Sequence, residues 1–232
     1  MASVSSDLTS QEYFQENIII LDVETTGLNA SSNRIVQLAM LKIQNNGLMT
    51  TFDNYFNPCV SRQAQTSAFR VHGICPDMLM MKAPFCDYLK EIIDFIGETK
   101  YLCGHNVAFD WKFLLEEFTR ADSSFGKCLV GKNLVLIDTL KLSRKAFPQF
   151  ESYKLQSLSS CLGLNITQND LLDLKIDKPV LRIHDAMVDV LLTKKLLYKV
   201  MQTLCSTNNS GSQQLSLSEL LDKHYCVVAK KT

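Results

Sequence analysis

The chain lacks an excess of basic residues. Its 24 lysines and arginines equal its 24 aspartates and glutamates, so the formal net charge is zero over 232 residues. A long duplex-binding groove usually carries a basic excess. The balance therefore argues against an extended surface for nucleic acid, but it is compatible with a small footprint of a few nucleotides.

Paired cysteines and apolar segments of membrane length are also missing. The eight cysteines form no C-x-x-C pair, and most lie inside apolar runs. This pattern is typical of reduced, buried thiols and not of a disulfide framework or a zinc site. Residues 1–17 form a polar leader without the features of a signal peptide, and no apolar run approaches ~18 residues. We therefore expect a cytoplasmic protein without a membrane partner.

The remaining pattern predicts an α/β domain. Three β-branched segments indicate an antiparallel meander, at residues 17–23, 34–43 and 50–56. Helical periodicity then alternates with two short buried strands near 101–104 and 134–137. The helices are expected near 88–96, 109–118, 155–162 and 184–201, and a further helix is expected directly after Asp138, which is placed to cap it. A meander followed by this alternation predicts a mixed sheet flanked by helices.

One domain accounts for most of the chain. We expect it to cover residues 18–205, after the polar leader. Residues 206–214 are rich in Ser, Asn and Gln, a composition typical of a flexible linker. The predicted linker and C-terminal tail together span 206–232.

Asp22 and Glu24 lie two residues apart at the end of the first predicted strand. The period of a strand places both side chains on one face, at the edge of the core. Two carboxylates there repel each other and lose hydration unless a cation lies between them. Their hard oxygen atoms favour Mg²⁺ or Mn²⁺ over zinc. The alternative is a turn whose acidic side chains simply face water.

Two further acidic elements stand where helices begin. Asp110 falls in the first turn of a predicted helix, where an acid also interacts well with the helix dipole. His184 and Asp189 lie where the last long helix is expected to begin. A loop histidine at 184 can reach over a site into which Asp189 points, although a lone histidine at this place is usually a helix cap or a surface group.

Taken in chain order, the three elements resemble the motifs of the DEDDh family of 3'→5' exonucleases. The matching segments are Asp-Val-Glu-Thr-Thr-Gly at 22–27, His-Asn-Val-Ala-Phe-Asp at 105–110 and His-Asp-Ala-Met-Val-Asp at 184–189. Residues 71–74 and 137–140 are also similar to family segments. The resemblance covers residues 18–201 and, within the family, is greatest to the proofreading epsilon subunit of bacterial DNA polymerase III. It implies a ribonuclease H-like fold. Gln37 departs from the family, whose members often carry Glu there, and we assign it no catalytic role.

The resemblance implies hydrolysis that releases nucleoside 5'-monophosphates with two divalent cations, Mg²⁺ or Mn²⁺. The implied metal ligands are Asp22, Glu24, Asp110 and Asp189. His184 is implied as the general base, a role that suits an imidazole at neutral pH.

Contacts to the substrate are implied for the turn after the first strand and for one histidine. The implied residues are Thr25, Thr26, Gly27, Leu28 and His72. Structural roles are the alternatives, because Gly27 can serve a turn that needs a positive φ and His72 can be a core histidine. His105 is expected to be structural.

The tail offers a second, shorter resemblance. Gln-Leu-Ser-Leu-Ser at 214–218 is similar to the peptide by which bacterial replication proteins bind the sliding clamp, with Ser218 in place of the final aromatic residue. Gln214, Leu215 and Leu217 are the implied clamp contacts, and a helix start capped by Ser216 or Ser218 is the alternative.

Three functions remain open from the sequence. The first is proofreading at a single-stranded or frayed DNA 3' end, with a DNA polymerase and a sliding clamp as partners. The second is a stand-alone RNA 3'→5' exonuclease with the same chemistry. The third is a catalytically silent nucleic-acid-binding module of the replisome. The clamp-like tail favours the first, and the complete set of motif residues argues against the third.

Overall fold

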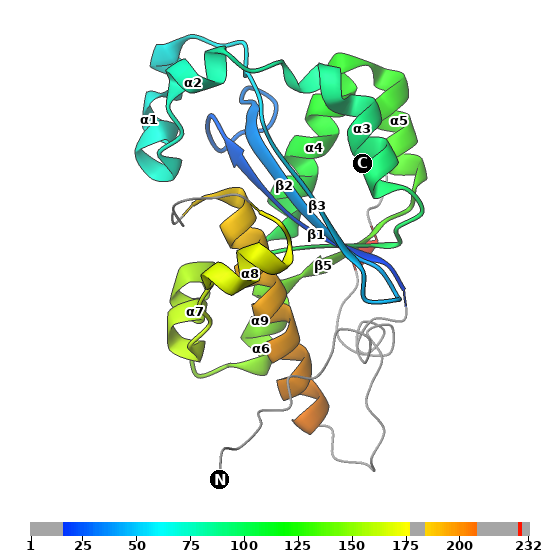
Figure 1. Cartoon of the computed structure of the whole chain (residues 1–232), viewed down its shortest axis with the longest axis vertical. Helices are drawn as coiled ribbons and strands as arrows, with labels where there is room; N and C mark the ends of the chain where they lie inside the picture. Colours follow the sequence, from blue (N-terminus) through cyan, green and yellow to red (C-terminus); the bar gives the residue numbers. More distant parts are fainter. Residues whose placement is uncertain (1–15, 177–183, 208–226, 229–232) are drawn as a thin grey trace.

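The computed structural model describes residues 16–176, 184–207 and 227–228 (Figure 1). Most of the predicted leader and most of the predicted linker lie outside these ranges. The clamp-like peptide with Gln214, Leu215 and Leu217 also lies outside the described residues.

A mixed sheet forms the centre of the molecule, with strand order β3-β2-β1-β4-β5-β6. The strands are β1 (Ile18–Thr25), β2 (Ile35–Ile43), β3 (Met49–Tyr55), β4 (Tyr101–Gly104), β5 (Val135–Asp138) and β6 (Val227–Val228). The first three pair antiparallel, as predicted, whereas β4 pairs parallel with β1 and with β5. Strand β6 pairs antiparallel with β5, so part of the predicted tail joins the sheet edge.

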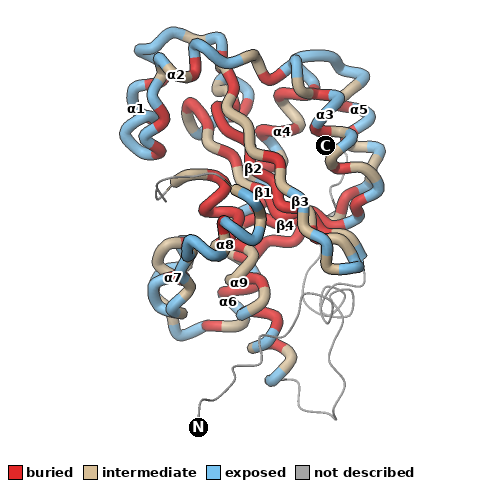
Figure 2. Tube along the Cα trace, in the orientation of Figure 1, coloured by how far each residue is buried: buried red, intermediate tan, exposed pale blue. Residues whose placement is uncertain are grey.

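Helices cover both faces of this sheet. The side chains of β1 point alternately to the two faces and pack on a different group of helices on each. Ile18 and Ile20 pack with residues of α6 to α9, while Ile19 and Leu21 pack with residues of α3 to α5. In Figure 1 the two groups of helices lie on opposite sides of the strands, and Figure 2 shows the strands as the buried centre. The α/β class and the flanking helices are therefore confirmed.

The helical elements are α1 (Arg62–His72), α2 (Pro76–Met80), the 3₁₀ helix η2 (Phe85–Tyr88), α3 (Leu89–Ile96), α4 (Val107–Ala121), α5 (Ser123–Gly131), α6 (Thr139–Ala146), α7 (Leu155–Leu162), α8 (Gln168–Asp173) and α9 (Ala186–Thr207). Four of them, α1, α2, α5 and α8, were not predicted. Helix α1 shows why, because it buries only Gln65, Ala68 and His72. So few buried apolar positions leave no helical period in the sequence.

The predicted bounds of the last helix were wrong at both ends. His184 has φ 61°, in the left-handed region, so the helix begins only at Ala186. Its other end is Thr207, two residues beyond the predicted end of the domain.

The expectation of buried thiols was also wrong. All described cysteines are free, but Cys59, Cys75, Cys86, Cys128 and Cys161 are exposed and only Cys103 is fully buried. Within the described ranges, no helix has both the length and the apolar content needed to cross a bilayer.

Candidate active site

Side chains from three motifs meet at the carboxyl end of β1. Asp22 and Glu24 come from the strand itself, Asp110 from the first turn of α4, and Asp189 from the first turn of α9. One ligand atom each from Glu24, His184 and Asp189 lies within 4.8 Å of the other two. The structure therefore brings together residues that lie up to 167 positions apart in the chain, from Asp22 to Asp189.

The start of α4 aims Asp110 into this cluster. Asn106 precedes the helix with φ 71°, and its N–H donates to Asp138 Oδ1 at 3.0 Å. Gly104 allows the close approach, because a Cβ there would lie 3.1 Å from Val107 Cβ. Asp110 is buried, and its Oδ1 accepts from Val23 N–H at 3.2 Å. The helix start is thus joined to the strand that carries Asp22 and Glu24.

The start of α9 is held by polar side chains of β2 and β3. Asp185 Oδ1 accepts from the N–H groups of Met187 (3.0 Å) and Val188 (3.4 Å), and its Oδ2 accepts from Tyr55 Oη at 3.3 Å. Buried Gln37 accepts from Ala186 N–H at 3.2 Å. These bonds cap the helix and place His184 directly before it. No role was predicted for Gln37 or Tyr55, although a polar residue inside an apolar strand was a visible signal.

Burial, together with neighbouring negative charges, raises the pKa of all four carboxyl groups. Burial, followed by the charges of Asp189, Asp185 and Asp110, raises the pKa of Glu24 to about 8. Burial is also the main cause that raises the pKa values of Asp110 and Asp189 to about 7, against the opposing N–H donors of Val23 and Gln156. The pKa of Asp22 is raised by burial and then by Asp110, Asp189 and Glu24. Such a cluster disfavours its own ionisation unless positive charge is supplied.

A divalent cation fits this donor set. The carboxylate oxygens are hard ligands of the kind that Mg²⁺ and Mn²⁺ prefer, and a cation would offset the repulsion that raises the pKa values. Glu24, His184 and Asp189 are close enough to share one ion.

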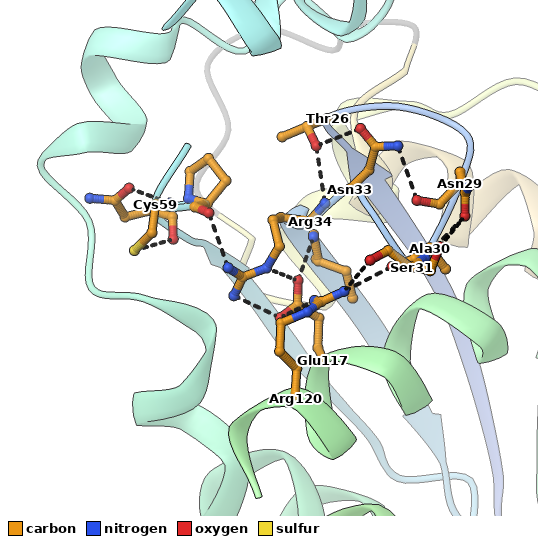
Figure 3. Close-up of polar contacts among 12 residues, drawn as sticks. Thr26, Asn29, Ala30, Ser31, Asn33, Arg34, Cys59, Glu117 and Arg120 are labelled. Atoms are coloured by element: carbon orange, nitrogen blue, oxygen red, sulfur yellow. Dashed lines mark hydrogen bonds and ion pairs between the residues drawn. The ribbon is translucent and has the colours of Figure 1, made fainter. Parts of the chain in front are cut away.

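The turn after β1 is an ordered loop (Figure 3). Thr26 N–H donates to Arg34 O at 2.9 Å, and Thr26 Oγ1 donates to Asn33 Oδ1 at 3.2 Å. Gly27 is not among the glycines with positive φ, so the alternative interpretation, a turn that needs a positive φ, was wrong. A Cβ at Gly27 would lie 2.6 Å from Asn33 Oδ1, so the glycine permits a close approach instead. Leu28 is 87% exposed at the tip.

Buried Glu117 of α4 anchors the same loop. Arg34 Nε and Nη2 donate to its two oxygens at 2.7 and 2.9 Å, and Ile35 N–H donates to Oε1 at 3.1 Å. Arg120 Nη1 lies 3.2 Å from Glu117 Oε2, and Arg120 Nη2 donates to Ala30 O at 2.9 Å (Figure 3). Nothing local in the sequence signals this network, because Arg34 and Glu117 are far apart in the chain.

His72 is buried beside the turn that follows β1. Its Nδ1 accepts from Ile74 N–H at 3.0 Å. Burial lowers the pKa of His72 to about 4, the Thr25 backbone opposes the shift, and His184 adds to it. A neutral His72 therefore packs between the end of α1 and the site.

A groove of about 600 Å³ opens beside the carboxylates. Asp22, His184 and Asp189 line it together with residues from the ends of β4, α6 and α7. The latter include His105, Asn106, Arg144, Glu151, Tyr153, Lys154 and Gln156.

Comparison with known proteins gives one family model, described as Exonuclease, which matches residues 19–197. DNA polymerase III PolC-type of Bacillus subtilis (strain 168) is 29% identical over 191 residues, which is 81% of this chain and 12% of that protein. The 3'-5' exonuclease DinG of the same organism is 31% identical over 189 residues, or 81% of this chain and 18% of that protein. This chain therefore spans less than a fifth of the length of these relatives. DNA polymerase III subunit epsilon of Buchnera aphidicola subsp. Schizaphis graminum (strain Sg) is 32% identical over 57% of this chain and 58% of its own length.

Solved structures show the same fold. Exonuclease X, in complex with 5' overhanging duplex DNA, superposes with a TM-score of 0.57 at 20% identity, over 86% of this chain and 97% of that chain. E. coli Exonuclease I, in complex with a dA16 oligonucleotide, gives a TM-score of 0.61 at 20% identity, over 82% of this chain and 41% of that chain.

Proposed function

This chain belongs to the exonuclease family, and from that premise we propose that it removes nucleotides from the 3' end of a DNA strand with two divalent cations. The observation that carries the proposal is the convergence of Glu24, His184 and Asp189 within 4.8 Å. It is supported by the raised pKa values of the surrounding carboxyls, which a cation would restore towards their ordinary range.

Each motif residue has a part in the proposed reaction. Asp22, Glu24, Asp110 and Asp189 hold Mg²⁺ or Mn²⁺. Bound cations of this kind stabilise the charge of a phosphodiester under attack and of its leaving oxygen. His184 accepts the proton of the attacking water, because its ring nitrogen lies beside the carboxylates of Glu24 and Asp189.

The loop after β1 receives the terminal nucleotide in this proposal. Thr25, Thr26 and Gly27 form the turn, and exposed Leu28 packs on the base. Thr26 N–H donates to Arg34 O and Thr25 Oγ1 donates to Gly27 O, so hydrogen bonds within the loop hold the shape of the turn. Buried His72 interacts with the backbone of Thr25 and so supports the turn. Contacts to a backbone and a strand end carry little sequence information, so cleavage is largely independent of sequence.

DNA is the proposed substrate, and the similar proteins support this choice. Two of them are DNA polymerase III proteins, and the solved structures contain DNA. We propose proofreading with a DNA polymerase, at a single-stranded or frayed 3' end. The cysteines in the described part of the chain are all free thiols, which suits a reducing compartment such as the cytoplasm.

Digestion of matched, end-labelled DNA and RNA strands tests the proposal. With Mg²⁺ or Mn²⁺, the protein should shorten DNA from the 3' end and release mononucleotides, while Asp22→Asn and EDTA should abolish the reaction. Glu98→Gln, an exposed acid outside the site, is the matched control and should retain activity. Faster digestion of RNA would replace DNA by RNA as the substrate, and an inert wild type with both ions would refute catalysis.

The clamp-like peptide gives a separate proposal about a partner. Gln214, Leu215 and Leu217 would bind a bacterial sliding clamp. Gln214→Ala should weaken retention of the chain on immobilised clamp, and equal retention of wild type and variant would end this proposal.

A further inference from the structure

We propose that the groove beside the carboxylates binds the DNA backbone on the 5' side of the scissile phosphate, through a basic wall made of Arg144, Tyr153 and Lys154. This inference rests on the proposed function, because it assigns the path of that substrate. The three wall residues line the same groove of about 600 Å³ as Asp22, His184 and Asp189. One continuous strand can therefore touch both sets.

Arg144 is presented to the groove in a form suited to phosphate. Its guanidinium carbon lies 5.7 Å from the centre of the Tyr153 ring, and Tyr153 Oη donates to Phe147 O at 2.7 Å. Stacking on a ring that is itself held in place leaves the planar N–H groups free for an anion. Among the acidic residues that the structure describes, none forms an ion pair with Arg144 or with Lys154.

His105 sets the position of the wall relative to the carboxylates. Its Nε2 lies 2.8 Å from Tyr153 O, and its Nδ1 lies 3.0 Å from Thr139 Oγ1. A carbonyl oxygen only accepts, so Nε2 carries the hydrogen. The ring therefore ties the end of β4, next to Asn106, to the segment that carries Tyr153 and Lys154. His105 is a positioning residue in this scheme.

The polarity of the strand follows from what occupies the other side of the site. The loop of Thr25 to Leu28 is closed behind by Arg34, Glu117 and His72, and it is the proposed place of the terminal nucleotide. A strand that passes over Asp22 and His184 then continues towards α6 and α7. Arg144 and Lys154 make a short basic track beside the carboxylates, and a track of only two cations is consistent with a chain of zero net charge.

The test compares Arg144→Ala with Lys145→Ala, which removes a neighbouring exposed cation that does not line the groove. On single-stranded DNA of a dozen nucleotides, Arg144→Ala should raise KM roughly tenfold with kcat nearly unchanged. Lys145→Ala should leave KM as in the wild type. A dinucleotide without a 5' phosphate has no phosphate on the 5' side of the scissile one, so on this substrate Arg144→Ala should behave as the wild type.

Charge dependence gives a second readout. The slope of log KM against log salt should fall by about 0.7 for each lost phosphate contact. Glu151 also lines the groove, close in sequence to Tyr153 and Lys154. Glu151→Gln removes its negative charge and should lower KM for the long strand. Lys154→Ala should raise it, as an independent check on Arg144.

Two results would overturn the basic wall. One is an unchanged KM of Arg144→Ala and Lys154→Ala on the long strand, and the other is an equal loss on the dinucleotide. Anisotropy of a labelled strand with Ca²⁺ in place of Mg²⁺ separates this inference from catalysis. If the wild type does not cleave but binds the strand more tightly than Arg144→Ala does, the proposed function fails and the wall stands. If the wild type cleaves but binds the strand no more tightly than Arg144→Ala does, the basic wall is refuted and the proposed function is not.

Discussion

Replacing Glu24 by glutamine should stabilise the protein in the absence of metal while it abolishes activity. The substitution keeps the shape of the side chain and removes one charge from the cluster. Burial, with Asp189, Asp185 and Asp110, raises the pKa of Glu24 from 4.5 to about 8. The folded protein therefore holds a proton that the unfolded chain releases. Stability from this group is complete below pH 4.5 and is lost as the pH rises to about 8.

The size of the effect follows from the shift. Raising the carboxyl pKa by this amount corresponds to at most about 5 kcal/mol of stability lost at pH 8 and above. Glutamine must still be desolvated, so we expect the Glu24→Gln variant to gain roughly 2 kcal/mol at that pH. For a chain of this length the gain corresponds to about 6 °C in Tm. At pH 5 the gain should be small.

Thermal unfolding with EDTA at pH 5 and pH 8 measures this difference, and exposed Glu98→Gln serves as the control. Adding Mg²⁺ should then raise the Tm of the wild type more than that of the variant, because the ion binds the folded state through Glu24. A variant that melts below the wild type in EDTA at pH 8 would refute the reasoning, as would an equal gain at pH 5.

Three other substitutions probe the surroundings of the site. Glu117→Gln weakens the ion pair with Arg34, and calorimetry should show a loss of about 2 kcal/mol with a higher KM. Gly27→Ala places a Cβ against Asn33, so activity should fall severalfold and a second change, Asn33→Gly, should restore it. Leu28→Ala removes an exposed side chain, so KM should rise while the Tm stays the same within about 1 °C.

The parts of the site that could be predicted are those whose residues lie close together in short sequence motifs. Asp22 and Glu24 end a β-branched run, and Asp110 and Asp189 open helices, so each motif could be placed at a strand end or a helix start. Parallel pairing of β1 and β4 then brings the first two motifs to one edge. Local patterns sufficed because the chemistry is concentrated where regular elements begin and end.

Long-range contacts of polar side chains could not be predicted. The pairs Arg34 with Glu117 and Tyr55 with Asp185 join residues separated by 83 and 130 positions. Neither pair leaves a periodic signal, since each requires the register of the sheet and the packing of a helix on it. The exposed cysteines were missed for a related reason, because apolar neighbours in sequence do not determine which side of a helix faces water.

Each motif is held by a residue that lies outside it, and the repulsion within the site explains why. Glu117 holds the loop after β1, the side chain of Asp138 bonds the Asn106 amide before α4, and Gln37 holds the start of α9. Four carboxylates at one edge push their elements apart until a cation binds. Anchors made of buried hydrogen bonds resist that push, so the ligands are already in place when the ion arrives. Loss of an anchor should therefore weaken metal binding before it unfolds the sheet.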